Sequence, residues 1–202
     1  MSFLKVLVIG DVGTGKTSLV NRIVYNTFTE KYKATIGCEF GLKILDINGE
    51  AVRIQLWDLA GQDRLGGVSR LYCRDANGAL VISDLTREET ISKAADWKHS
   101  VDENVRLADS SNIPMVLCLN KADAFAKDDP KLNIDLEALA EKHNYVNCFY
   151  TSARTGANAN EALERLVREI MKSFQPQSQD INAVFLNRDQ GQKVTKKKAC
   201  CN

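Results

Sequence analysis

One stretch constrains this chain more than any other feature: Gly-Asp-Val-Gly-Thr-Gly-Lys-Thr at residues 10–17. It follows the apolar run 3–9 and leads into residues 17–20, whose apolar spacing is helical, so the order strand, loop, helix is predicted. This is the context that the pattern G-x-x-x-x-G-K-[ST] needs in a phosphate-binding loop. A glycine turn beside a surface lysine is the plain alternative, but strand, loop, Lys-Thr pair and helix would all have to coincide.

The residue types in this stretch suit an anion. Glycines let the backbone curl with its N–H groups pointing inward, and the N-terminus of the next helix adds a positive dipole end. Lys16 would reach the outer phosphates as a point charge, and the Thr17 hydroxyl would take one position on Mg²⁺. We expect nucleotide contacts along the whole segment: Gly10, Asp11, Val12, Gly13, Thr14, Gly15, Lys16, Thr17 and Ser18.

Length and charge narrow the class of protein. The 202 residues fit one domain of ordinary size. The formal charge is +1, from 27 basic and 26 acidic residues, so no overall field favours nucleic acid as a partner. The six cysteines show no C-x-x-C pair and no zinc spacing, and no apolar run approaches the ~18 residues of a membrane helix. A reducing, cytoplasmic setting is expected.

The rest of the chain alternates strand and helix patterns. Asn48-Gly49 is a hairpin signal between strands at 38–44 and 52–57, which should pair antiparallel. Further patterns predict strands at 79–82, 114–119 and 146–150, and helices at 87–107, 132–143 and up to residue 174, while 26–37 is a loop. We therefore predict an α/β fold of the P-loop NTPase kind: a six-stranded, mostly parallel sheet with helices on both faces.

Composition changes at residue 175 to Gln, Ser, Asn, Asp and Lys, and Pro176 stops the preceding helix. We expect one folded domain over residues 1–174 and a flexible tail over 175–202. The tail carries an excess of lysine and arginine and, near its end, the adjacent pair Cys200 and Cys201.

Polar residues follow several of the predicted strands, at the sheet edge where ligands of open α/β sheets bind. Asp58 follows Trp57 and is a second Mg²⁺ candidate, acting through a bound water. A helix-capping aspartate is the alternative for Asp58, and only the phosphate loop upstream favours the metal. Asn-Lys-Ala-Asp at 120–123 and Thr-Ser-Ala at 151–153 reach the same edge.

Four of these stretches, at 10–17, 58–62, 120–123 and 151–153, together resemble the Ras superfamily of small GTPases, and the resemblance covers nearly the whole of residues 1–174. T-I-G-C-E-F at 35–40, Leu-Lys at 42–43, Y-C-R-D-A-N-G at 72–78 and the paired cysteines are similar to the Rab branch. W-D-L-A-G-Q, with an aliphatic residue where most Rabs have threonine, and the long segment before Pro114 resemble Rabs of lysosome-related organelles.

The resemblance implies a guanine site, and the chemistry agrees. Guanine presents N1–H and an exocyclic amine side by side, and the Asp123 carboxylate can accept both, whereas adenine would meet it with a lone pair. A site whose buried acceptor stays unpaired discriminates by roughly 10⁴ to 10⁵, so ATP should be rejected. By resemblance the remaining base contacts come from Phe28, Asn120, Lys121, Ser152, Ala153 and Arg154.

The resemblance also implies a Mg²⁺-dependent GTP/GDP switch that hydrolyses GTP. Lys16 and the Gly61 N–H would hold the γ-phosphate, Gln62 would orient the attacking water, and Thr17, Thr35 and Asp58 would form the metal site. No built-in arginine finger is apparent, so hydrolysis should be slow, on the order of 10⁻⁴ to 10⁻³ per second, until an activating protein acts. Exchange factors, effectors and escort or dissociation-inhibitor proteins are the other expected partners.

Loops that contact the γ-phosphate should order with GTP and loosen with GDP. Effectors would then bind the residues that this change displays: Ile36, Gly37, Phe40, Trp57, Leu65 and Tyr72. Core packing is the ordinary alternative for such apolar residues, and we expect it for Phe40.

Val12 departs from the resemblance, because Ras proteins have glycine there and most Rabs a small residue. A branched side chain beside Gln62 predicts slow turnover, and the alternative is a GTP-locked binding module with negligible hydrolysis. A metabolic P-loop phosphotransferase is a second rival, which the guanine signature disfavours.

By resemblance, Cys200 and Cys201 carry geranylgeranyl groups, which differs from the C-a-a-X signal. Two prenyl chains beside lysines would anchor the chain stably to the cytosolic face of endosomal or lysosome-related membranes. Two free thiols on a basic tail are the alternative.

Overall fold

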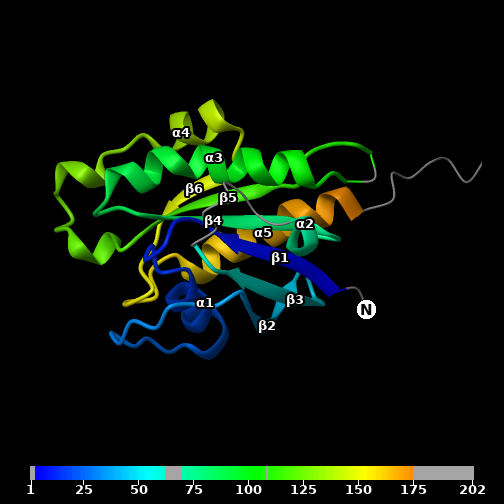
Figure 1. Ribbon diagram of the computed structural model, residues 1–202, viewed down its shortest axis with the longest axis horizontal. Coiled ribbons are helices and arrows are strands. Elements are labelled where there is room, and N and C mark those ends of the chain that lie inside the picture. The colour runs from blue at the N-terminus through cyan, green and yellow to red at the C-terminus, as the bar shows by residue number, and fades with distance from the viewer. Residues whose placement is uncertain (1–2, 62–69, 108, 175–202) are drawn as a thin grey trace, which may run out of the picture.

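The computed structural model describes residues 3–61, 70–107 and 109–174, and within them six strands form one sheet in the order β2-β3-β1-β4-β5-β6 (Figure 1). β2 pairs antiparallel with β3, and the other neighbours are parallel. The strands are β1 (Phe3–Ile9), β2 (Cys38–Ile47), β3 (Glu50–Leu59), β4 (Gly78–Asp84), β5 (Met115–Asn120) and β6 (Asn147–Tyr150). The predicted α/β, mostly parallel architecture is confirmed.

Helices cover both faces of the sheet (Figure 1). The helices α1 (Lys16–Tyr25) and α5 (Ala159–Phe174) pack on one face, and α3 (Glu88–Asn104) and α4 (Leu136–His143) pack on the other. A single short helix, α2 (Arg70–Cys73), follows the undescribed segment 62–69. The β2–β3 turn has positive φ at Asn48 (56°) and Gly49 (86°), as its hairpin signal predicts.

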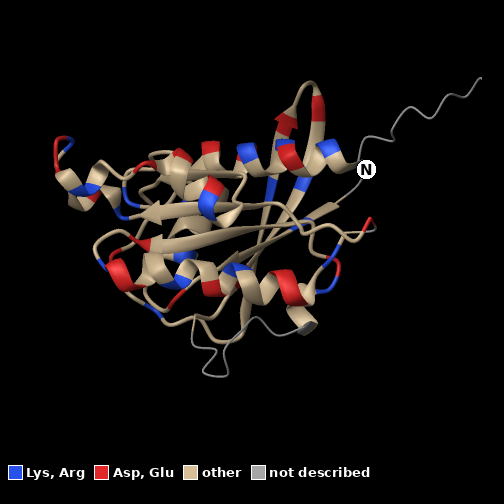
Figure 2. Ribbon diagram, turned by 90° about the horizontal axis from the view of Figure 1, so that it is seen from above, with Lys and Arg blue, Asp and Glu red and all other residues tan. Residues whose placement is uncertain are grey.

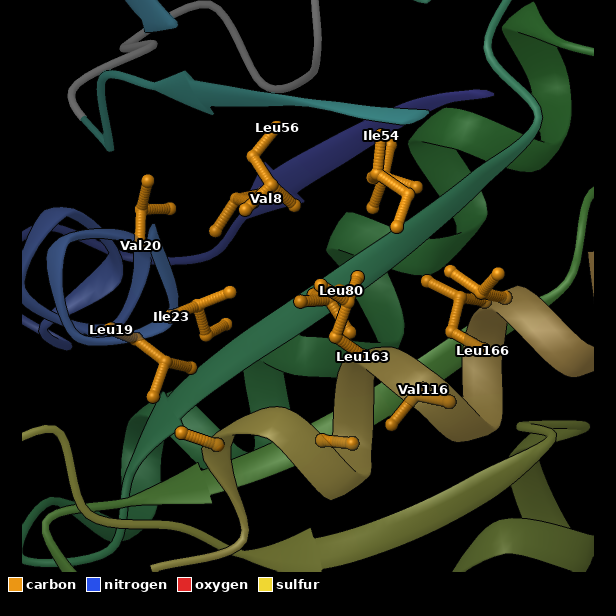
Figure 3. Close-up of a cluster of buried hydrophobic side chains, with 14 of the residues drawn as sticks. Val8, Leu19, Val20, Ile23, Ile54, Leu56, Leu80, Val116, Leu163 and Leu166 are labelled. Carbon is orange, nitrogen blue, oxygen red and sulfur yellow. The ribbon is translucent and has the colours of Figure 1, made fainter. Parts of the chain in front are cut away.

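The core on the α1 and α5 side fixes the helix that follows the phosphate-binding loop. Aliphatic side chains from the central strands meet α1 and α5 there, and all those labelled in Figure 3 are buried: Val8, Leu19, Val20, Ile23, Ile54, Leu56, Leu80, Val116, Leu163 and Leu166. Each such side chain contributes about 1.5–3 kcal/mol by leaving water. This packing seats α1 firmly against the sheet, so its N-terminal residues have a defined position.

Charged residues lie mainly along the helices and loops, with both signs interspersed, and the central strands carry few of them (Figure 2). The distribution agrees with the near-zero net charge of +1. Among the residues that the structure describes, no helix is long and apolar enough to cross a membrane.

Several predicted boundaries were wrong. β3 continues to Leu59, so Asp58 lies inside the strand rather than after it. The helix predicted at 132–143 is a 3₁₀ turn at Pro130–Leu132 followed by α4, because the Asp135 carboxylate accepts a hydrogen bond from the Ala138 N–H (3.0 Å) and caps the new helix. The helix predicted at 87–107 is shorter and ends at Asn104.

Candidate functional site

The phosphate-binding loop lies between β1 and α1, and two of its glycines, Gly10 and Gly15, are required by contact as well as by conformation. A Cβ on Gly10 (φ 139°) would lie 2.1 Å from the Ile82 carbonyl oxygen, and one on Gly15 (φ 91°) would lie 2.5 Å from Asn120 Nδ2. The loop therefore packs directly on β4 and on the end of β5, where no side chain would fit.

Lys16, the first residue of α1, is buried, and its Nζ donates to the carbonyl oxygens of Gly10 and Asp11 (both 2.9 Å). Burial lowers the pKa of Lys16 to about 8, although the charges of Asp58 and Asp11 favour its ammonium form. The lysine thus curls over the loop, with its charge at the centre of the site.

A cavity of about 690 Å³ opens over this loop, a volume typical of small-molecule sites. Most of the predicted site residues line it: Val12, Gly13, Gly15, Lys16, Thr17, Ser18, Phe28, Thr35, Gly61, Asn120, Lys121, Asp123, Ala153 and Arg154. A second group of predicted residues does not line the cavity but is hydrogen-bonded to residues that do: Gly10, Asp11, Thr14, Asp58 and Ser152. Segments far apart in the sequence therefore converge on one pocket.

Two hydroxyls and a carboxylate meet at the start of α1. Thr17 Oγ1 lies 2.8 Å from Thr35 Oγ1 and donates to Asp58 Oδ2 (2.5 Å). The other oxygen of Asp58, Oδ1, is buried and has no hydrogen-bond partner among the described residues. Burial raises the pKa of Asp58 to about 6, against the Thr17 hydrogen bond and the Lys16 charge. An unpartnered carboxylate oxygen beside two hydroxyls is a donor set that fits Mg²⁺.

The loops after β5 and β6 are tied together by Asn120, which is 1% exposed. Its Nδ2 donates to the Thr14 carbonyl oxygen (2.9 Å) and its Oδ1 accepts from the Ala153 N–H (3.2 Å). The N–H of Ala153, one of the residues expected to contact the base, is therefore directed at Asn120.

Asp123 is held at the wall of the same part of the cavity. Its Oδ1 accepts from the Ser152 hydroxyl (2.5 Å), and its Oδ2 lies 3.4 Å from Arg154 Nε. The Arg154 guanidinium also lies 5.6 Å from the centre of the Phe28 ring and pairs with Glu30 (2.9 Å). The carboxylate is thus oriented before any ligand arrives.

Gly61 lies against the phosphate-binding loop. A Cβ at this position would lie 2.5 Å from the Val12 nitrogen and 2.7 Å from Lys16 Nζ, so only glycine permits this approach. Val12 itself is 41% exposed at the cavity.

The described residues that were expected to face effectors do not line this cavity. Ile36 is 91% exposed, and the Gly37 carbonyl accepts from the Ala60 N–H (2.9 Å). The expectation of core packing for Phe40 was wrong: it is 63% exposed and lies edge-on to Trp57, with ring centres 4.4 Å apart. Tyr72 is half-buried. The predicted residues Gln62, Leu65, Cys200 and Cys201 lie outside the described residues.

Sequence reasoning missed Asp84, the last residue of β4. Its buried carboxylate accepts from Lys121 Nζ (2.6 Å) and Arg87 Nε (3.0 Å). Burial alone would raise the pKa of Asp84, but hydrogen bonds from Lys121, Thr86 and Arg87 bring it below its ordinary value. Its place at a strand's carboxyl end was the available signal.

Comparison with known proteins agrees with this geometry. The family model described as Ras family matches residues 5–172. The chain is 38% identical to Ras-related protein Rab-32C of Dictyostelium discoideum over 202 residues, covering 98% of this chain and 88% of the relative. Human Ras-related protein Rab-32 is 38% identical over 201 residues, with the same coverage. Human Ras-related protein Rab-7L1 is 34% identical over 204 residues, covering 98% and 96%.

These relatives span nearly the whole chain, and proteins of this kind bind and hydrolyse GTP. The match agrees with the resemblance that the four strand-end stretches predicted. From its sequence, its sheet and its relatives, the chain belongs to the Ras family as a Rab-type GTPase related to the Rabs of lysosome-related organelles, a GTP-binding switch in membrane traffic.

Proposed function

We propose that the chain binds GTP and Mg²⁺ in the 690 Å³ cavity, hydrolyses GTP slowly, and recruits effectors to a membrane while GTP is bound. The observation that carries the proposal is the convergence of three chemistries on one pocket. Loop 10–17 offers amides and Lys16, and Asp123 offers a carboxylate. The Thr17 and Thr35 hydroxyls lie beside Asp58, one of whose oxygens has no hydrogen-bond partner in the described part of the chain.

Asp123 selects the base in this proposal. Its two oxygens would accept the N1–H and the exocyclic amine of guanine, while the Lys121 stem and Phe28 border the ring. Asn120, fixed to Thr14 and to the Ala153 N–H, keeps the base loops in register with the phosphate loop.

Residues at the other end of the cavity act on the phosphates. Lys16 and the amides of the loop hold the β- and γ-phosphates, and Thr17, Thr35 and Asp58 hold Mg²⁺, which neutralises phosphate charge when bound. The Gly61 N–H faces the γ-phosphate, and Gln62, outside the described residues, orients the attacking water. Without an arginine supplied by an activating protein, turnover stays slow.

In this proposal, Val12 limits the rate of GTP hydrolysis. Its branched side chain stands at the cavity beside Gly61, where Gln62 and an activating arginine would have to approach. The second candidate is therefore a module that stays GTP-bound. Single-turnover hydrolysis with an activating protein distinguishes them, since only a working GTPase is accelerated.

Effectors would bind the surface around Ile36, Phe40 and Trp57, with Gly37 and Tyr72 beside it and Leu65 in the undescribed segment. Exposure of 91% at Ile36 and 63% at Phe40 leaves apolar area for a partner. Because Thr35 precedes this surface directly, loss of the γ-phosphate would loosen it.

Residues 1–174 would form the GTPase domain and residues 175–202 a tail that ends in a membrane anchor. Geranylgeranyl groups on Cys200 and Cys201, beside a basic tail, would hold the protein on the cytosolic face of endosomal or lysosome-related membranes. Replacing both cysteines with serine should release the protein from membranes in cells. Undiminished membrane binding would contradict the anchor.

The nucleotide itself tests the core of the proposal. Purified protein is denatured and the released nucleotide is identified by chromatography. We expect GDP or GTP in near-stoichiometric amount, and the same after incubation with mixed nucleotides and Mg²⁺. Adenine nucleotide, or none, would contradict the proposal.

A further inference from the structure

The outer rim of the phosphate-binding loop is attached to helix α3. Asp11, the second residue of the loop, directs its carboxylate away from the cavity toward this helix. Its Oδ1 accepts from Trp97 Nε1 (2.8 Å) and its Oδ2 lies 3.1 Å from Lys93 Nζ. Residues 93 and 97 are one turn apart on one helix face, so each donor serves one oxygen of a carboxylate that is 19% exposed.

A second attachment comes from the segment that leads into α3. Arg87 Nη2 donates to the Val12 carbonyl oxygen (2.8 Å), and Arg87 Nε donates to Asp84 Oδ2 (3.0 Å). Asp84 Oδ2 also accepts a hydrogen bond from Lys121 Nζ (2.6 Å). The arginine therefore bridges a peptide of the phosphate loop and a buried carboxylate that contacts the base-side loop.

These contacts fix the peptides that a phosphate site depends on. In an anion-binding loop the N–H groups point inward at the ligand. The Gly10 and Asp11 carbonyls accept from Lys16 Nζ, whereas the Val12 carbonyl and the Asp11 carboxylate are held on the outer side of the loop, away from the cavity. Arg87 and Trp97 supply donors there, and neither is among the described residues that line the cavity. Their influence on a ligand would pass through the loop.

We propose that Arg87 and Trp97 are positioning residues for phosphate binding: they hold loop 10–17 from outside, so that its amides keep the geometry that grips a nucleotide. The inference rests on the proposed function, because it presupposes nucleotide phosphates in this cavity. Lys93 has a smaller part, since its side chain is 55% exposed and its ion pair with Asp11 is solvated.

Conservative variants of the full-length protein test this role. Trp97→Phe keeps an aromatic ring and removes the N–H donor, and Arg87→Lys keeps the charge but cannot reach both partners in the same geometry. Fluorescent GDP should dissociate about three- to tenfold faster from each variant, the change that the net loss of one ordinary hydrogen bond implies. In phosphorus NMR of bound GDP, the β-phosphate resonance should move more than the α-phosphate resonance.

Two matched controls separate positioning from general stability. Tyr145→Phe removes an aromatic donor that also holds α3, through the Ala94 carbonyl (2.9 Å), without touching the loop. Arg165→Lys alters an arginine ion pair with Glu169 on α5. Both should keep the wild-type GDP dissociation rate and phosphorus spectrum, even if melting temperature falls.

Wild-type dissociation rates and spectra in Trp97→Phe and Arg87→Lys would overturn the inference, and so would equal changes in Tyr145→Phe. If Trp97→Phe does not fold by circular dichroism, Lys93→Gln tests the same Asp11 carboxylate, with an increase of about twofold expected for an exposed pair. A wild-type protein that binds no GDP would refute the proposed function as well, whereas bound GDP with unaltered variants refutes only the positioning role.

Discussion

The two halves of the cavity are built differently. On the base side, buried Asn120 joins three loops through Thr14 and Ala153, and Ser152 and Arg154 hold Asp123. On the other side, residues 31–37 lie largely exposed, with Tyr32 at 71% and Ile36 at 91%. Their described side-chain link to the phosphate loop is a pair of hydroxyls, Thr35 and Thr17.

This difference in order suits two different tasks: the well-held base side suits selection of a ligand, and the exposed segment suits a response to it. Selection needs groups that are oriented in advance, because reorganisation would reduce discrimination. A response needs a segment with few buried contacts, whose ordering a ligand can pay for. In the proposed function one cavity does both, because its two ends differ in how much of their structure the rest of the fold determines.

Removing the preformed carboxylate should have the largest effect. We expect Asp123→Ala to lose most of the preference for GTP over ATP, by roughly 10⁴, because the acceptor pair for guanine is gone. Competition binding with the two nucleotides measures this ratio. Asp128→Ala, at an exposed aspartate in the same loop, is the matched control and should keep it. An Asp123→Ala protein with the wild-type ratio would contradict the base-side assignment.

Substitutions of Thr17 and Thr35, whose hydroxyls are in contact, test the difference between the two sides of the cavity more finely. Thr17 touches Asp58 as well as Thr35, so Thr17→Ala should weaken both GDP and GTP, by about 10- to 100-fold in the presence of Mg²⁺. Thr35→Ala should weaken the triphosphate alone, since in the proposed function Thr35 contacts a γ-phosphate that GDP lacks. Mg²⁺ titrations with each nucleotide measure both. Equal losses of GDP affinity in the two variants would show that Thr35 does not distinguish the two states.

Hydrolysis rates of Val12 variants test the phosphate end of the cavity. Val12→Gly should raise intrinsic single-turnover hydrolysis by about tenfold, in the range that small displacements near reacting atoms cost. Val12→Ala is the graded control and should fall between the two. Equal rates for all three proteins would remove Val12 from the explanation of slow turnover.

Asp84 links the base-side loop to the phosphate-binding loop through Lys121 and Arg87, and we expect the smallest effect from its substitution. Its pKa is lowered in the folded state, so its ionised form stabilises the fold at neutral pH and this stabilisation disappears in acid. Asp84→Asn should reduce the free energy of unfolding at pH 7 by about 1 kcal/mol. In urea unfolding, the gap to wild type should narrow below the ordinary aspartate pKa of about 3.9. Asp128→Asn should show no gap, and a pH-independent gap for Asp84→Asn would contradict the mechanism.

The fold followed from local signals. The apolar run before Gly10 and the Asn48-Gly49 turn each determine an element through their own chemistry, and both elements formed as predicted. The ends of helices and strands that depend on contacts with other elements were not predicted correctly. The predicted helix included residues 132–135, yet Asp135 caps a helix that starts later. At its C-terminal end β3 gains Asp58 and Leu59 through their pairing with Glu39 and Cys38.

The candidate site shows the same division. Residues 10–17 and 120–123 could be read directly, because each carries its chemistry in consecutive positions. The contacts of Asp11 with Trp97 and of Val12 with Arg87 span 86 and 75 positions, and no local pattern predicts such pairs. Phe40 was misjudged for a related reason: alternation along β2 predicts two faces, but which of them is covered depends on where α1 packs.

Strand β2 lies at the edge of the sheet, and its two faces differ completely. Inward, Gly41 lies beneath α1, where a Cβ would come within 2.9 Å of Val24, so this face leaves no room for variation. Outward, Phe40, Leu42 and Ile44 are 63%, 52% and 56% exposed and bear little of the fold's stability. Substitutions on this outer face should therefore leave the positions of Lys16 and Thr17 unchanged. Sequences that descend from this one can thus change the partners that bind the outer face of β2 without changing the cavity proposed to bind the nucleotide.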